Sequence, residues 1–188
     1  AHYRAQHRLG ILVSGLPEGK KVVVLYGASD PPGERQVVAA GQLWLSDWYD
    51  NGTALYLAIE TTLIHEGDIR YLFVAWNSSF PVLLDRFTVL EALYKTQYLV
   101  SLHFTSSDGR YTVEPEEVWI LGSGPNASLI RLAPPYGPMW LDRINWTIVK
   151  VLWQSSNVVW PGQGPYLPEP SGTWVVRCRS GGGARRGA

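Results

Sequence analysis

Short apolar segments, rich in β-branched and aromatic side chains, follow one another along this chain, and turn residues separate them. Asp50-Asn51-Gly52 and Glu66-Gly67-Asp68 are examples of such turns. Short strands at regular spacing, without long helical patterns between them, indicate a sandwich or barrel. The expected strands are Lys20–Tyr26, Thr53–Glu60, Ile69–Trp76, Gln97–Phe104, Glu117–Gly122, Ile144–Trp153 and Thr173–Arg179, with shorter candidates at Gln36–Ala40, Gln42–Ser46 and Ser156–Trp160.

These segments predict an all-β protein of about ten strands with at most one short helix. The helix is expected from Asp85 as N-cap through Phe87, Leu90, Leu93 and Tyr94, although this segment also fits a strand. A chain of 188 residues is by default one domain. We therefore expect a single β-sandwich of Greek-key or jelly-roll type over residues 17–179, an N-terminal extension over 1–16 and a Gly/Arg-rich tail over 180–188. The sequence contains no evident internal repeat.

Four of the five asparagines lie in the acceptor sequence for N-linked glycosylation. Ser and Thr number 23 of 188 residues, so chance would give about 0.6 such sites among five asparagines. The excess predicts an exported glycoprotein, because glycan attachment requires passage across a membrane. The predicted sites are Asn51, Asn77, Asn126 and Asn145, while Asn157 lies outside the motif.

Composition agrees with a secreted or cell-surface protein. Charged residues make up 17% of the chain, below the roughly 25% of an average soluble domain. The formal net charge is zero, so nucleic acid is not an expected partner. No apolar run reaches the roughly 18 residues of a membrane-spanning helix. The start at Ala1 suits a mature protein whose signal peptide has been removed.

No pattern in the sequence indicates a catalytic site, so we expect neither an enzyme nor a cofactor. The four histidines lack metal-ligand spacing. Calcium is a minor possibility, since Asp47, Asp50 and Asn51 gather oxygen ligands on one loop. A glycoside hydrolase would need a carboxylate pair. Its candidates are Glu114, Glu116 and Glu117, with partners among Asp47, Asp68 and Asp142.

The nine tryptophans are expected first in the core, second at an assembly interface and third at a sugar-binding surface. The surface candidates are Trp44, Trp48, Trp140 and Trp160. The lone cysteine, Cys178, excludes an internal disulfide. Because it alternates with arginine and shares a strand face with Trp174 and Val176, we expect a small core residue, and its redox state is left open.

The segment Leu9–Leu16 is apolar on both faces and follows a polar, basic lead over residues 1–8. An extended segment of this kind can complete the sheet of a neighbouring molecule, with backbone hydrogen bonds giving affinity. The alternative is an ordinary first strand of the chain's own sandwich. The residues expected at a subunit interface are Leu9, Ile11, Leu12, Val13 and Leu16.

Dense acceptor sites, a single sandwich, no pilin-type helix and the apolar segment from Leu9 together resemble the exported subunits of archaeal extracellular filaments, the bundling pili and threads. That resemblance implies a glycosylated sandwich that polymerises head to tail by donating its N-terminal strand. The expected function is a structural subunit of a cell-surface filament. Its partners would be copies of itself, with contacts to the cell envelope or neighbouring filaments. The alternatives are a secreted carbohydrate-binding module that uses exposed tryptophans and, behind it, a secreted glycoside hydrolase.

Overall fold

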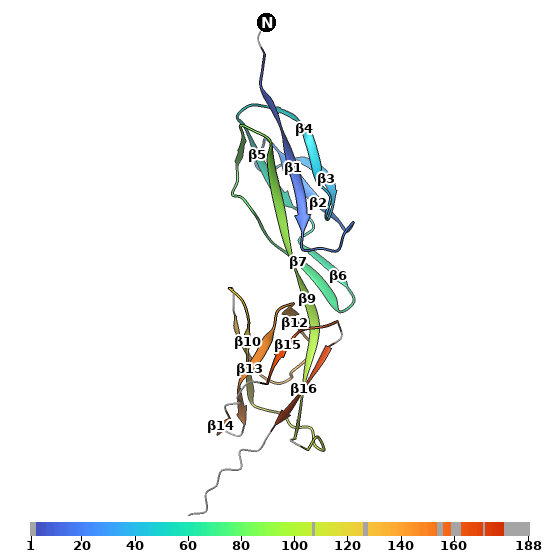
Figure 1. The fold of residues 1–188 in the computed structure, drawn as a ribbon, viewed down its shortest axis with the longest axis vertical. Helices are drawn as coiled ribbons and strands as arrows, with labels where there is room; N and C mark the ends of the chain where they lie inside the picture. Colours follow the sequence, from blue (N-terminus) through green and yellow to red (C-terminus); the bar gives the residue numbers. More distant parts are fainter. Residues whose placement is uncertain are drawn as a thin grey trace, which may run out of the picture. The chain divides into compact units, whose positions relative to one another are not determined.

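The computed structural model describes residues 3–106, 108–125, 128–153, 156–158, 163–170 and 172–178. Within these residues the regular structure consists of sixteen strands and no helix, which confirms the all-β prediction (Figure 1). The chain divides into two compact units, Ala1–Thr96 (unit 1) and Gln97–Ala188 (unit 2). The single sandwich expected over residues 17–179 is therefore not what forms, and the predicted tail over 180–188 lies outside the described residues.

Unit 1 is a sandwich of two sheets. One sheet has the order β4-β1-β9-β7-β6, and the other has the order β3-β2-β5-β8. The strands are β1 (Gln6–Ser14), β2 (Lys21–Gly27), β3 (Glu34–Ala39), β4 (Trp44–Asp50), β5 (Thr53–Ile59), β6 (Leu63–Glu66), β7 (Ile69–Trp76), β8 (Val82–Leu84) and the first part of β9 (Thr88–Ser106).

The core of unit 1 follows from alternation along its strands, since successive side chains of a strand point to opposite faces. On β1, Leu9, Ile11 and Val13 are fully buried, and on β2 Val22 and Val24 meet them in the same cluster. Aromatic rings close the cluster through edge-on contacts such as that between Phe73 and Tyr94. The two sheets thus share one apolar interior.

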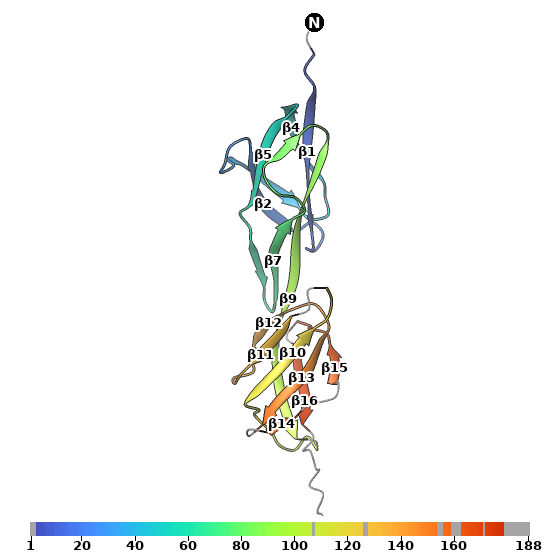
Figure 2. The same cartoon turned by 90° about the vertical axis from the view of Figure 1, so that its left-hand side faces the viewer.

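Unit 2 is built from the second part of β9 and from later strands (Figure 2). β9 is flanked by β12 and β16, and a second sheet has the order β11-β10-β13-β14, with β15 also pairing with β13. Its core includes Val100, Leu102 and Phe104 of β9. The later strands are β10 (Glu117–Gly122), β11 (Leu129–Leu132), β12 (Met139–Asp142), β13 (Trp146–Trp153), β14 (Ser156–Val158), β15 (Gln163–Tyr166) and β16 (Gly172–Cys178).

The two units repeat one topology although the sequence shows no repeat. In unit 1 the first strand, β1, is followed by the antiparallel pair β2–β3, then by β4, which pairs with β1, and by β5, which pairs with β2. In unit 2, β9 is followed by the antiparallel pair β10–β11, then by β12, which pairs with β9, and by β13, which pairs with β10. In each unit the last strand lies parallel to the first: β9 to β1, and β16 to β9. Strand β9 is therefore the last strand of one sandwich and the first strand of the next.

The helix predicted from Asp85 is wrong, because the segment forms the beginning of β9. A helix would place Leu90, Leu93 and Tyr94 on one face. In the structure Leu90 is 2% exposed and Tyr94 6% exposed, whereas Leu93 is 38% exposed and lies on the opposite face. Pairing of β9 with β1 from Leu9↔Thr88 to Ser14↔Leu93 fixes this alternation.

We expect the replacement Leu9→Ala to destabilise unit 1 by about 2–5 kcal/mol, because it removes a fully buried side chain and leaves a cavity. The matched control is Leu83→Ala, the same change at a leucine that is 62% exposed, which should shift stability by less than about 0.5 kcal/mol. Urea unfolding followed by tryptophan fluorescence measures both. Equal effects of the two variants would contradict the assignment of β1 to the core.

Candidate functional surfaces

The segment expected to mediate assembly, Leu9–Leu16, lies within the chain's own sandwich. Residues 9–14 belong to β1, which pairs with β4 on one side and with β9 on the other. Leu9, Ile11 and Val13 point into the core, Leu12 is half-buried on the other face, and Leu16 packs against the edge of the core. This is the arrangement of the alternative interpretation, an ordinary first strand. Exchange of this strand between subunits stays a prediction.

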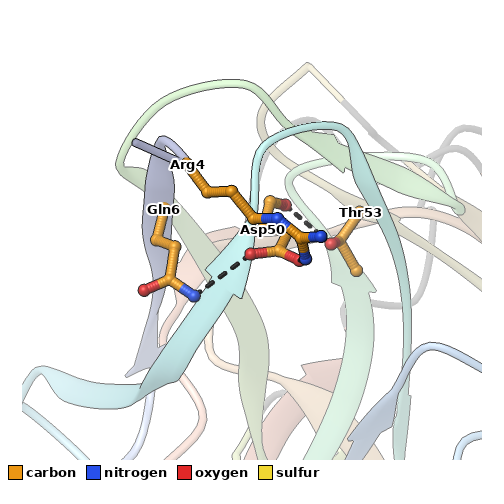
Figure 3. Close-up of polar contacts among 4 residues, drawn as sticks. All are labelled: Arg4, Gln6, Asp50 and Thr53. Atoms are coloured by element: carbon orange, nitrogen blue, oxygen red, sulfur yellow. Dashed lines mark hydrogen bonds and ion pairs between the residues drawn. The ribbon is translucent and has the colours of Figure 1, made fainter. Parts of the chain in front are cut away.

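Arg4, before β1, and Gln6, the first residue of β1, contact Asp50 at the end of β4 (Figure 3). Arg4 Nη1 lies 3.3 Å from Asp50 Oδ2, and Gln6 Nε2 donates to Asp50 Oδ1 at 3.1 Å. Thr53 Oγ1 donates to the backbone carbonyl of Asp50 at 2.6 Å. Both carboxylate oxygens of Asp50, a candidate calcium ligand, therefore have protein donors.

The predicted glycosylation site Asn51 lies in the exposed turn between β4 and β5. Its backbone N–H donates to the carbonyl of Ala5 at 2.9 Å. Its side-chain Oδ1 lies 3.0 Å from Nε2 of His7. A glycan is attached to the amide nitrogen, Nδ2, so these contacts hold the side chain through its other atoms.

Asn77 and Asn145 are also exposed. Asn77 follows β7, and its Oδ1 accepts a hydrogen bond from the Glu91 N–H at 2.9 Å. Asn145 directly precedes β13, and its carbonyl accepts from the Ser123 N–H at 2.8 Å. Asn126 lies outside the described residues. The three described acceptor residues are thus accessible to solvent, as attachment of a glycan requires, and attachment itself stays a prediction.

Of the tryptophans expected at the surface, Trp48 on β4 is the exposed one among those described, at 63%. The Arg8 guanidinium lies 5.6 Å from the centre of its ring, within the range of a cation–π contact. Trp44 instead packs edge-on against Tyr26, at a centroid distance of 5.1 Å, and belongs to the rim of the core. Trp140 on β12 is half-buried, and Trp160 lies outside the described residues.

A small apolar surface cluster covers Gly10 on the outer face of β1. Gly10 pairs with Leu45 on β4 and with Val89 on β9. A Cβ placed on Gly10 would meet Leu43 and Val89 at 3.1 Å and Phe87 at 3.4 Å. Leu43, Phe87 and Val89 are 49%, 54% and 38% exposed, so they shield the backbone of β1 while remaining in contact with water. Sequence reasoning missed this cluster, because Leu43 is far in sequence from Phe87 and Val89, and all three are far from Gly10.

In unit 2 a buried carboxylate anchors an aromatic and basic cluster. Glu117 accepts hydrogen bonds from Trp119 Nε1 and, at 2.6 Å, from Arg131 Nε. Arg131 and Lys150 also approach the ring of Trp119, at 5.9 and 5.6 Å from its centre. Burial opposes ionisation of Glu117, but the donors Trp119 and Arg131 outweigh it and hold the pKa of the carboxyl below its ordinary value. Such a carboxylate suits an ion pair better than a general acid, which needs a raised pKa.

The remaining candidate carboxylates are divided between the two units. Asp47 and Asp68 belong to unit 1, whereas Glu114, Glu116 and Asp142 belong to unit 2. The described residues hold no group of three or more His, Cys, Asp or Glu that could bind a metal ion. Asp142 accepts a hydrogen bond from Gln97.

Cys178 is half-buried at the edge of the unit 2 core, on the same face of β16 as Trp174 and Val176. Burial raises the pKa of its thiol, which disfavours the reactive thiolate.

A shallow surface hollow of about 290 Å³ in unit 1 is lined by Lys21, Val37, Val38, Ala39, Gln42, Leu43 and Trp44. No helix capable of crossing a membrane occurs among the described residues.

No protein-family model matches the sequence, and no curated protein matches it. Among solved structures, a leucine-rich repeat protein from Bacteroides thetaiotaomicron VPI-5482 aligns with 93% of this chain at 11% identity and a TM-score of 0.30, and the chain spans 26% of that protein. A mutant of the shaft pilin SpaA from Lactobacillus rhamnosus GG aligns with 96% of this chain and 99% of the pilin, at 10% identity and a TM-score of 0.33. A second structure of the shaft pilin SpaA from Lactobacillus rhamnosus GG aligns with 92% of this chain and 97% of the pilin, at 10% identity and a TM-score of 0.27. Likeness at this level does not extend to function.

We expect protein from its native source to carry one N-linked glycan at each of Asn51, Asn77, Asn126 and Asn145. Each single Asn→Gln replacement should lower the intact mass by one glycan, as measured by mass spectrometry. The matched control is Asn157→Gln, which lies outside the acceptor motif and should leave the glycan mass unchanged. Native protein with the bare polypeptide mass would contradict the prediction.

We expect Glu117→Gln to destabilise unit 2 in a pH-dependent manner. The folded pKa lies below the ordinary value of 4.5, so the stabilisation by ionised Glu117 is complete above that value and is lost as pH falls through the folded pKa. The difference between variant and parent should therefore be present at pH 7 and shrink below about pH 4.5. Denaturant unfolding across this range measures it. Glu116→Gln removes the same charge from an exposed neighbour, and an equal effect there would contradict the assignment.

Proposed function

We propose that this chain is a non-enzymatic structural subunit of an N-glycosylated, extracellular cell-surface filament. The observation that carries the proposal is the serial construction of the chain, in which β9 completes one sandwich and begins the next. Two sandwiches of the same plan that share one strand support a structural role for the chain. The exposed acceptor residues Asn51, Asn77 and Asn145 support an extracellular location.

Assembly in this proposal is head to tail between copies of the chain. A heterologous contact that does not close gives an open polymer. In the finer form of the proposal, β1 of one subunit occupies the place of β1 in the next. The place of β1 is well defined, because the strand pairs with both β4 and β9 and its Leu9, Ile11 and Val13 side chains are at most 1% exposed. Exchange of an identical element replaces each contact within the chain by the same contact between chains, which makes it a low-cost route to assembly.

We expect negative-stain electron microscopy of native, cell-derived material to show regular filaments that contain this chain. Filament labelling by an antibody raised against the purified chain identifies the subunit. Discrete monomers at high concentration would contradict a polymer.

Engineered disulfides between β1 and β9 distinguish strand exchange from assembly through other surfaces. Ser14 lies opposite Leu93, both near the outer surface, and neighbouring strands lie about 4.8 Å apart, which a disulfide spans. In filaments of the Ser14→Cys/Leu93→Cys variant in a Cys178→Ser background, strand exchange predicts a ladder of covalent oligomers on a non-reducing gel. Monomers bridged internally would contradict exchange while leaving the filament proposal intact. The two single-cysteine variants are the controls and should form neither product.

Carbohydrate binding is the second candidate function, and the exposure of Trp48 favours it. An indole that is 63% exposed beside a guanidinium offers both a stacking face and hydrogen-bond donors to a sugar ring. Should native material be monomeric, glycan binding that is abolished by Trp48→Ala and kept in Trp44→Ala would support this function instead.

A further inference from the structure

The first and last strands of each unit form a parallel ladder, and the direction of these ladders determines how the chain responds to tension. In unit 1, six residue pairs join β1 to β9, from Leu9↔Thr88 to Ser14↔Leu93. In unit 2, seven pairs join β9 to β16, from Gly172↔Val100 to Cys178↔Ser106. The chain enters unit 1 at the start of β1 and leaves it along β9. It enters unit 2 along β9 and leaves it at the end of β16.

Because the paired strands are parallel, the point of entry and the point of exit lie at opposite ends of each ladder. Tension on the chain before β1 pulls that strand toward its N-terminus, and tension along β9 pulls the partner toward its C-terminus. The two strands are then loaded in shear, so the pairs of the ladder must break together. If both forces acted at the same end of the ladder, the pairs would break one after another.

The side chains on these strands add to the resistance. In unit 1, sliding β1 past β9 drags Leu9, Ile11 and Val13 through a close-packed core, since all three are at most 1% exposed. In unit 2, Trp174 and Val176 of β16 are buried at 6% and 1% exposure, so the same motion displaces them. β1 is also paired with β4 along its other edge.

We propose that β1, β9 and β16 form a load-bearing path through the protein, in which tension passes from β1 to β9 and from β9 to β16 through two parallel ladders loaded in shear. The other strands lie outside the direct path and serve to hold these three in place. Mechanical resistance is then a property of each sandwich and does not depend on the proposed filament.

Single-molecule force spectroscopy with two anchor geometries for each unit tests the proposal. All variants carry Cys178→Ser and one pair of new cysteines for attachment. In unit 1, anchors at Tyr3→Cys and Thr96→Cys shear β1 against β9, whereas Glu18→Cys and Thr96→Cys pull from the same end of the ladder. In unit 2, anchors at Thr96→Cys and Arg177→Cys shear β9 against β16, whereas Thr96→Cys and Glu169→Cys pull from the same end.

We expect a severalfold higher unfolding force in the shear geometry than in the same-end geometry, for each unit separately. Forced unfolding is governed by the unfolding rate under load, so the comparison is made at one pulling speed. Circular dichroism and thermal melting confirm that the variants of a unit fold equally well without load. Equal forces in the two geometries of either unit would overturn the load path for that unit. A chain that forms no filament can still give the shear result, so failure of the proposed function is a distinguishable outcome.

Discussion

Strand β9 is the element on which both sandwiches depend. In unit 1 it lies between β1 and β7, and in unit 2 it lies between β12 and β16. Leu90, Ala92 and Tyr94 supply the core of the first unit, and Val100, Leu102 and Phe104 supply that of the second. All six residues are even-numbered and lie on one strand, but the alternation of buried and exposed side chains is interrupted between the two sets, where Gln97 is buried and Thr96 and Tyr98 are half-buried. Strand β9 thus contributes to two separate interiors. Neither core is complete without it.

This continuity explains why the sequence predicts the fold class but not the division into units. Most strands could be identified from their β-branched and aromatic residues, and Gln97–Phe104 in particular alternates cleanly. A boundary between two domains is normally marked in the sequence by Gly, Pro or polar linker residues. Residues 88–106 contain neither Gly nor Pro, because the boundary falls inside a strand. The spacing of Leu90, Leu93 and Tyr94 favoured a helix, but pairing with β1 overrides such local preference.

The same distinction applies to the candidate surfaces. Some of their features can be predicted from neighbouring residues in the sequence, whereas others depend on how the strands pair. Exposure of Asn51 follows from Asp50-Asn51-Gly52, which is ordinary turn sequence. The contact of His7 with Asn51 arises only because β1 pairs with β4 in one register. Likewise, Arg131 reaches Glu117 because the register of β10 and β11 places Arg131 opposite Trp119. Trp44 resembles a loop tryptophan in sequence, yet contact with Tyr26 makes it part of the core rim.

The positions of the acceptor residues are compatible with a mechanical role for the three central strands. Asn51 lies in the β4–β5 turn, Asn77 follows β7 and Asn145 precedes β13, so none of these three belongs to β1, β9 or β16. Glycans at these sites would coat the surface without occupying a ladder position. Two ladders that share β9 are loaded in series and carry the same tension, so the weaker one sets the strength of the chain. Selection for strength would therefore act on both ladders together, and the similar numbers of pairs, six and seven, agree with that requirement.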